Sequence, residues 1–121
     1  MMDWLIQAFG FVEKERWVEQ GKLTHGELAC GESVIMIASP VDSFQSMKTV
    51  AENYTPAREW RSHPYIFDGV LVYVDDVHAH WQRAEAAGAT LIGEIQTGFP
   101  GTRYRAEDPE GHRWFFIQRE G

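Results

Sequence analysis

Apolar residues recur at helical spacing in two segments of the chain and cluster in short runs elsewhere. Trp4–Phe9 and Val77–Ala87 carry apolar side chains three or four positions apart, which predicts a helix in each. Each segment ends beside a glycine, Gly10 or Gly88, a residue that stops helices in a left-handed conformation. Runs rich in β-branched and aromatic residues, bounded by turn residues, predict strands. The predicted strands are Glu15–Glu19, Leu23–Cys30, Ser33–Ala38, Gly69–Val74, Thr90–Gln96, Thr102–Glu107 and Arg113–Gln118.

A helix followed by a strand hairpin occurs twice in the same order. In each copy the turn glycine of the hairpin, Gly31 or Gly111, precedes two polar or charged residues and an apolar strand. The copies are separated by about eighty residues, which indicates a duplicated structural unit. We therefore expect an α+β domain in which two β-α-β-β-β modules form a curved, partly open, barrel-like sheet. Paired modules have a cleft between them, and we expect the function to lie there.

The expected domain comprises the whole chain, with module one at residues 1–40, a connector at 41–64 and module two at 65–121. Module one begins inside its helix and lacks the first strand that Gly69–Val74 supplies to module two. Two explanations stay open. Either Met1 marks a shortened or reassigned start, or another chain fills the gap.

The connector is expected to contain one helix. Phe44, Met47 and Val50 stand at helical spacing, and Pro56 closes the segment. The aromatic residues at the end of the connector have two interpretations, as a cover of the cleft or as part of a dimer contact. These residues are Trp60, Tyr65 and Phe67.

Composition narrows the class of protein. Of the 121 residues, 44% are hydrophobic, which is enough for a substantial core. The chain has 18 acidic and 11 basic residues without a cluster of Lys and Arg, which argues against a nucleic-acid partner. The apolar runs are too short to cross a bilayer, and no secretory signal is visible. Cys30 is the single cysteine and cannot form an intramolecular disulfide, so we expect a cytoplasmic protein without membrane contact.

Four segments resemble the vicinal oxygen chelate superfamily, the group of glyoxalases, bleomycin resistance proteins and extradiol dioxygenases. They are Trp4–Phe11, His25–Ala38, Gly69–Ala89 and Tyr104–Gln118. The run DPEGHRW at Asp108–Trp114 is the most specific of these motifs and looks like the small resistance-type branch. In catalytic members of this superfamily, His, Gln and Glu side chains from both modules hold one divalent metal in the cleft, where it polarises substrate oxygens.

The metal ligands of the family do not carry over to this chain. The resemblance places Gly69, Phe115 and Ile35 at three ligand positions, and the fourth lies on the first strand that module one lacks. None of these three side chains coordinates a metal. We therefore expect no metal, no cofactor and no catalytic residue. The resemblance implies an apolar cleft that binds its ligand by shape and stacking.

Strand alternation predicts which residues line this cleft. If Phe115 faces the cleft, Leu71 and Tyr73 face it as well. A four-residue turn at 108–111 would place Tyr104 opposite Phe115. These aromatic side chains would then form a stacking surface for a planar ligand, although they can equally well fill the interior of the sheet.

For several polar residues, the sequence leaves open whether they contact the ligand or lie elsewhere on the protein. Arg103 and Arg105 flank Tyr104 and are candidates to hold an anionic group of the ligand. His25 is a further candidate, because the pleat of its strand decides between core and cleft. His78 and His80 fall on the polar side of their helix, and we expect both at the surface.

Two smaller assignments concern a helix cap and the single cysteine. Asp75 or Asp76 is expected to cap the helix that follows. Cys30 has no basic neighbour that would form a thiolate, so a role as nucleophile is not expected.

The leading interpretation is a metal-independent protein that binds and sequesters a small, planar or aromatic molecule and forms a homodimer. The acidic surface favours a cationic ligand. Two alternatives stay open. One is a divalent-metal-dependent lyase, isomerase or dioxygenase of the same superfamily, with unexpected ligands such as His25 or Glu27. The other is an interaction module whose interior is filled.

Overall fold

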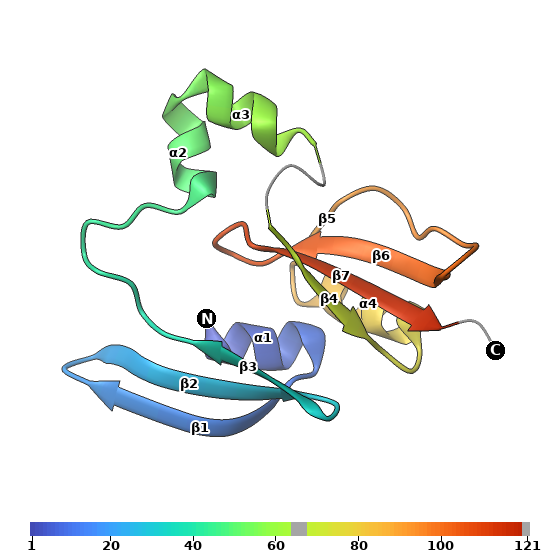
Figure 1. Ribbon diagram of the computed structural model, residues 1–121, viewed down its shortest axis with the longest axis horizontal. Helices are drawn as coiled ribbons and strands as arrows, with labels where there is room; N and C mark the ends of the chain where they lie inside the picture. Colours follow the sequence, from blue (N-terminus) through green and yellow to red (C-terminus); the bar gives the residue numbers. More distant parts are fainter. Residues whose placement is uncertain (64–67, 120–121) are drawn as a thin grey trace.

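The computed structural model describes residues 1–63 and 68–119, and Figure 1 shows how its elements are arranged. In chain order the described elements are α1 (Met2–Phe9), β1 (Val12–Glu19), β2 (Lys22–Cys30), β3 (Ser33–Ile37), α2 (Met47–Asn53), α3 (Thr55–Arg61), β4 (Val70–Tyr73), α4 (Val77–Ala86), β5 (Thr90–Leu91), β6 (Gly101–Glu107) and β7 (Arg113–Arg119). The interpretations that concern Tyr65 and Phe67 lie outside the described residues.

The strands form two sheets, each with a helix against one face. The order in the first sheet is β1-β2-β3, and the order in the second is β4-β7-β6-β5. β4 runs parallel to β7, and the other neighbouring strands are antiparallel. α1 contacts β1 and β2, α4 contacts β6 and β7, and the two helices contact each other. The α+β class and the repeated module are confirmed, and the sheets do not close into a barrel (Figure 1).

β4 has no counterpart in the first sheet. In module two, β4 precedes α4 and lies beside β7. In module one, β3 takes the place that corresponds to β7, and no strand of the described residues lies on its outer side. The first module therefore lacks its first strand, as the sequence predicts.

The two modules share one hydrophobic core. Phe9 of α1 is 2% exposed, and its ring centroid lies 4.7 Å from that of Phe116 and 5.5 Å from that of Trp114, both on β7. Leu28 of β2 is fully buried in the same cluster. Burial of one large apolar side chain stabilises a fold by about 1.5–3 kcal/mol. These contacts therefore fix one module against the other.

Local signals in the sequence set the ends of both core helices. Gly10 has φ 73°, and its N–H donates to the Ile6 carbonyl at 3.0 Å, so it stops α1 in the left-handed conformation. The Asp76 carboxylate accepts from the Ala79 N–H at 3.1 Å and caps α4. Both predictions are confirmed.

The hairpin of β6 and β7 differs from the prediction by one residue. Glu107 pairs with Arg113, not with His112, so five residues, 108–112, connect the two paired positions instead of four. The cause is the buried Asp108 carboxylate, whose Oδ1 accepts from the backbone N–H groups of Glu110 and His112 at 3.0 and 3.1 Å. These bonds draw His112 opposite Asp108. As a result Tyr104 pairs with Phe116, and the predicted pairing of Tyr104 with Phe115 is wrong.

The connector contains two helices, where the sequence predicts one that ends at Pro56. Pro56 lies in the first turn of α3, a position that tolerates proline because the first helical N–H groups have no acceptor within the helix. Ser46 caps α2, since its Oγ accepts from the Thr49 N–H at 3.2 Å. Contacts from Arg61 to Glu107 and from Arg113 to the Arg61 carbonyl attach this connector to the β6–β7 hairpin.

The predicted strand Thr90–Gln96 is shorter in the structure. Gly93 has φ 74°, which turns the backbone away from an extended conformation after β5. Gln96 returns to β6 only through an isolated bridge to Arg103.

Candidate functional site

Five of the seven predicted ligand-binding residues lie on one face of the second sheet. The register places Leu71 and Arg105 beside Phe115, and Tyr73 and Arg103 beside Ile117. Directly paired residues of neighbouring strands project to the same side of a sheet. This side is opposite to α4, and we call it the open face of module two. It carries Leu71, Tyr73, Phe115, Arg103 and Arg105.

The open face of module two carries both exposed and buried apolar side chains, since Ile117, which pairs with Tyr73, is only 2% exposed. Leu71 is 55% exposed and Tyr73 is 51% exposed, whereas Val72, which points toward α4, is buried. The Arg119 guanidinium lies 4.0 Å from the centre of the Tyr73 ring, in the geometry of a cation–π contact. The Arg103 guanidinium donates to the Gly101 carbonyl at 3.0 Å, and that of Arg105 to Oε1 of Gln96 at 3.4 Å. The face thus combines exposed apolar surface with three cationic side chains, one of which lies over the Tyr73 ring.

Tyr104 lies on the other side of this sheet, among the core residues. Its side chain is 3% exposed, and its ring centroid lies 5.2 Å from that of Phe116. Its hydroxyl lies 2.6 Å from Nδ1 of His80 on α4. Burial raises the pKa of this hydroxyl, so Tyr104 keeps its proton and can donate it to the imidazole.

His80 is part of the core, which corrects the expectation that it lies at the surface. Its Nε2 lies 2.9 Å from the Phe9 carbonyl, and its ring centroid lies 4.1 Å from that of Phe116. A carbonyl can only accept, so Nε2 carries the proton and Nδ1 accepts from the Tyr104 hydroxyl. Burial lowers the pKa of His80. The polar side of α4 is covered here by α1, a tertiary contact that helical spacing does not report. His78 is exposed as predicted.

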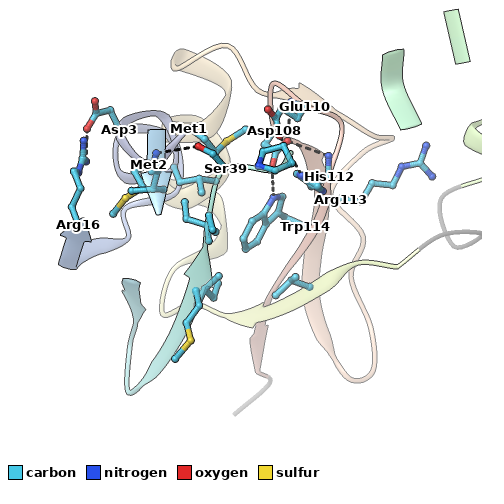
Figure 2. Close-up of a pocket in the computed structure, with 18 of the residues that line it drawn as sticks. Met1, Met2, Asp3, Arg16, Ser39, Asp108, Glu110, His112, Arg113 and Trp114 are labelled. Carbon is cyan, nitrogen blue, oxygen red and sulfur yellow. Dashed lines mark hydrogen bonds and ion pairs between the residues drawn. The ribbon is translucent and has the colours of Figure 1, made fainter. Parts of the chain in front are cut away.

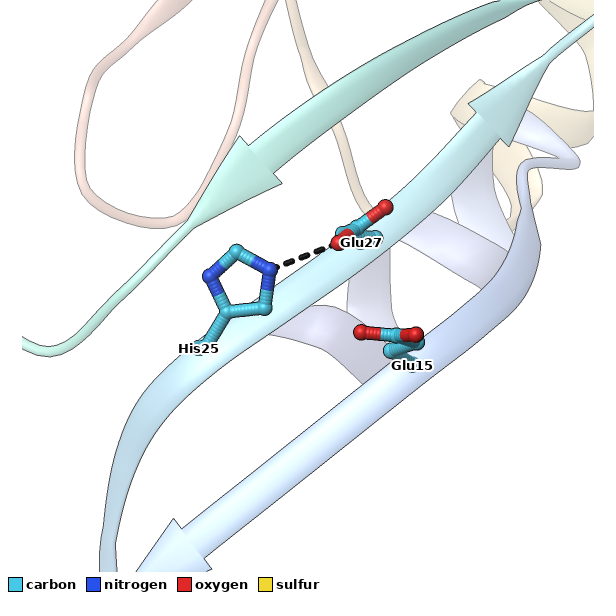
Figure 3. Close-up of side chains that lie close together, drawn as sticks. All are labelled: Glu15, His25 and Glu27. Carbon is cyan, nitrogen blue, oxygen red and sulfur yellow. Dashed lines mark hydrogen bonds and ion pairs between the residues drawn. The ribbon is translucent and has the colours of Figure 1, made fainter.

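His25 lies on the first sheet, on the face opposite to α1. Its Nε2 is 2.7 Å from the carboxylate of Glu27, and the carboxylate of Glu15 lies beside them (Figure 3). The ligand atoms of these three residues all lie within 4.8 Å of one another. The sequence indicates His25 and Glu27, but not Glu15. Glu15 reaches this cluster because β1 has a bulge between Glu13 and Glu15, and no residue pattern in the sequence predicts that bulge.

A groove of about 690 Å³ lies between the modules (Figure 2). One wall is the start of α1 with β3, and the other contains Gly69, Val70 and the β6–β7 turn. The groove follows the side of β3 where module one lacks a strand. None of the seven predicted ligand-binding residues is among the residues that line it. The expected cleft between the halves is present, but the predicted residues lie outside it.

The lining of this groove is mixed in character. Met2, Ile35, Ile37 and Trp114 supply apolar surface, and four acidic residues also line the groove. In Figure 2, Asp3 points toward Arg16 at one end, where their side chains form an ion pair of 2.7 Å. The acidic residues of the lining are Asp3, Asp68, Asp108 and Glu110.

An α-β-β-β module joined to a β-α-β-β-β module, each with a helix on one face of its sheet and the other face open, defines a paired-module domain of the glyoxalase type. The chain belongs to the Glyoxalase/Bleomycin resistance protein/Dioxygenase superfamily, which it matches over residues 1–116. It is 30% identical over 118 residues to an uncharacterized protein of Mycobacterium bovis, across 93% of this chain and 70% of that protein. An equally similar protein of Mycobacterium tuberculosis is covered over 63% of its length, so the chain spans about two thirds of these relatives.

Solved structures share the fold. TioX from Micromonospora sp. ML1 superposes with a TM-score of 0.69 at 28% identity, over 99% of this chain and 86% of TioX. TnmS3, an antibiotic binding protein from Streptomyces sp. CB03234, gives a TM-score of 0.62 at 19% identity, over 98% of this chain and 83% of that chain. At this identity the likeness to TnmS3 concerns the fold alone.

The metal positions of the superfamily do not fit an ion in this chain. A Cβ atom built on Gly69 would lie 2.1 Å from Cε2 of Phe115, so the Phe115 ring already fills the space of a side chain at position 69. Ile35 pairs with the buried Leu28 and packs against the core on the α1 side, so it does not correspond in orientation to Phe115. The β3 residue on the open face is Met36, which is 68% exposed and pairs with Glu27. Gly69, Phe115, Ile35 and Met36 offer no nitrogen or oxygen ligand in place of the His, Gln and Glu ligands of the superfamily.

Two further observations concern the reactivity of Cys30 and the length of the helices. Burial raises the pKa of the Cys30 thiol to about 11, so it is protonated at neutral pH and is no nucleophile. None of the described helices is both long and apolar enough to span a membrane.

Proposed function

We propose that this protein binds and sequesters a small planar molecule on the open face of module two, without a metal ion. The observation that carries the proposal is the exposed pair Leu71 and Tyr73 beside Phe115, at the place where catalytic members of the superfamily hold their metal. An aromatic ligand would cover this apolar surface and stack on the rings. Arg103 and Arg105 would orient an anionic substituent on it.

The exposed side chains set the scale of the hydrophobic contribution. Leu71 and Tyr73 are each about half exposed, so covering both contributes about 1.5–3 kcal/mol. Binding in the micromolar range corresponds to about 8 kcal/mol, so stacking on the rings and the charged contact with the anchored arginines would supply the remainder. TnmS3 is described as an antibiotic binding protein, and the fold that it shares with this chain agrees with a binding role.

We also propose that the chain forms a homodimer, in which a second copy covers part of the open sheet faces. On the first sheet the open face carries Trp17, which is 63% exposed, and Met36, which is 68% exposed. Exposed apolar surface of this kind marks interaction sites. A second copy would turn each open face into one wall of a closed cleft. A cytoplasmic location, supported by the lone Cys30, stays a prediction.

The test is a fluorescence titration of the full chain, treated with EDTA, with two planar probes. One probe is a cationic aminoacridine, and the other is an anionic anilinonaphthalene sulfonate. Saturable binding is expected for at least one probe, and Tyr73→Ala should weaken it by about tenfold, or about 1.4 kcal/mol. Tyr54→Ala is the matched control, because Tyr54 is 50% exposed but lies at the connector. Absence of saturable binding, or equal losses in both variants, would overturn the proposal.

A further inference from the structure

We propose that Glu15, His25 and Glu27 form a binding site for a first-row divalent transition-metal ion on the open face of the first sheet. This site lies on β1 and β2, away from the ligand positions of the superfamily at Gly69 and Phe115. It does not depend on the proposed binding of a planar molecule to module two.

A β-bulge brings the third side chain to the cluster. Glu13 pairs with the buried Leu28, and the next paired residue of β1 is Glu15, opposite Glu27. Lys14 is left without a partner in the register, and the extra residue turns Glu15 to the face that Glu27 and His25 share. Without the bulge, side-chain alternation would direct Glu15 to the opposite face. Bulges commonly re-aim side chains in this way at functional sites.

The carboxylates of Glu15 and Glu27 in this cluster favour the binding of a cation. Two carboxylates placed directly opposite each other on neighbouring strands repel. A divalent ion between Glu15 and Glu27 would neutralise both carboxylates and accept the lone pair of His25 Nε2 (Figure 3). The ion would take the position of the proton that His25 and Glu27 now share at 2.7 Å.

The donor set indicates the kind of ion. One imidazole nitrogen with two carboxylates suits zinc, manganese or ferrous iron better than calcium or magnesium, which prefer oxygen ligands alone. Bond lengths of about 2.0–2.2 Å to one ion bring ligand atoms closer together than the 4.8 Å that now encloses the three groups, which small rotamer changes allow. Three protein ligands leave coordination positions for water or for an oxygen of a bound molecule.

The site is accessible and partly shielded. The side chain of His25 is 38% exposed and that of Glu27 is 21% exposed. Met36 lies beside Glu27 on β3, and Trp17 lies beside His25 on β1. An ion can therefore reach the site from solvent in the single chain, and Trp17 is a fluorescent group at the edge of the site.

The experiment uses the untagged full chain, stripped with EDTA and desalted, and titrates it calorimetrically with zinc or manganese alone. One ion per chain is expected, and Glu15→Gln, His25→Gln and Glu27→Gln should each weaken binding by at least about tenfold. His112→Gln is the matched control, because His112 also stands beside a glutamate, Glu110, at 3.6 Å, but is not in the three-residue cluster. Circular dichroism of each variant establishes that it is folded.

A second measurement locates the ion. Nickel should quench the fluorescence of the protein, and Trp17→Phe should remove most of that quenching. The proposal is overturned if uptake is not saturable, if His112→Gln lowers it as much as His25→Gln, or if quenching persists unchanged in Trp17→Phe. A positive result with metal and a negative result with the planar probes would leave this site in place while removing the proposed function.

Discussion

The Tyr104 hydroxyl lies 2.6 Å from Nδ1 of His80 and joins β6 to α4 inside the core. The other nitrogen of the same ring donates to the Phe9 carbonyl at the end of α1, at 2.9 Å. One neutral imidazole therefore connects both helices and the second sheet. Protonation of the ring would place a donor against the Tyr104 hydroxyl, which now donates to it, and would charge a half-buried group.

The first prediction concerns the effect of acid on folding. Burial keeps the pKa of His80 below its usual value of 6.5, so the unfolded chain binds this proton more readily than the folded chain. The contribution of His80 to stability is complete above about pH 6.5 and is lost as the pH falls below that value. The free energy of unfolding in urea, measured between about pH 5 and pH 8, should fall as the pH decreases. His80→Asn should make this fall smaller. His78→Asn, an exposed change on the same helix, should leave the pH dependence as it is.

The second prediction concerns the hairpin turn. The Asp108 carboxylate is 2% exposed, accepts two backbone N–H groups through Oδ1, and accepts from Nε1 of Trp114 through Oδ2 at 3.1 Å. Asp108→Ala leaves these donors without a partner, which should lower the free energy of unfolding by more than about 2 kcal/mol. Asp75→Ala removes an exposed carboxylate before α4 and should change the free energy of unfolding by less than about 0.5 kcal/mol. Similar losses in the two variants would contradict the role of Asp108.

These elements show how far the sequence predicts the fold. The helix stop at Gly10, the cap at Asp76 and the repeated module follow from local signals, and the structure confirms them. The register of β6 and β7 does not follow from local signals, because one side chain, Asp108, determines the length of the turn. Helical spacing places His80 at the surface because it describes one helix at a time and omits the contact with α1.

The candidate site was predicted less completely than the fold. Alternation along single strands places Leu71, Tyr73 and Phe115 on one face, and the structure brings them together. The same argument fails for Tyr104, where the register is shifted by one residue. It also misses Glu15, which reaches the His25 cluster only through a bulge. Errors of this kind arise where hydrogen bonds between strands depart from the regular pattern.

The third prediction concerns the metal positions of the superfamily. Phe115→Glu alone should not create a site for a divalent ion, because Gly69 offers no donor beside it and Met36 and Ile35 offer no carboxylate. Metal content by mass spectrometry, measured in a His25→Gln background to silence the cluster on the first sheet, tests this. About one tightly held ion per chain in that variant would show that the remaining ligands lie elsewhere.

The fourth prediction concerns assembly. Sedimentation equilibrium should give twice the chain mass of 13.9 kDa. Trp17→Glu places a charge on the open face of the first sheet and should shift the protein to monomers. Val41→Glu changes a side chain that is 73% exposed at the start of the connector, and this variant should remain dimeric. A wild-type protein that sediments as a monomer at all concentrations would exclude the homodimer.

The most direct test of the proposed function is amide chemical-shift mapping of the metal-free protein by NMR during titration with the planar probe that binds. We predict that the largest shifts fall on β4, β6 and β7, around Leu71, Tyr73 and Phe115. Shifts confined to the groove between the modules, around Met2, Ile37 and Ser39, would contradict the assignment of the ligand to the open face of module two.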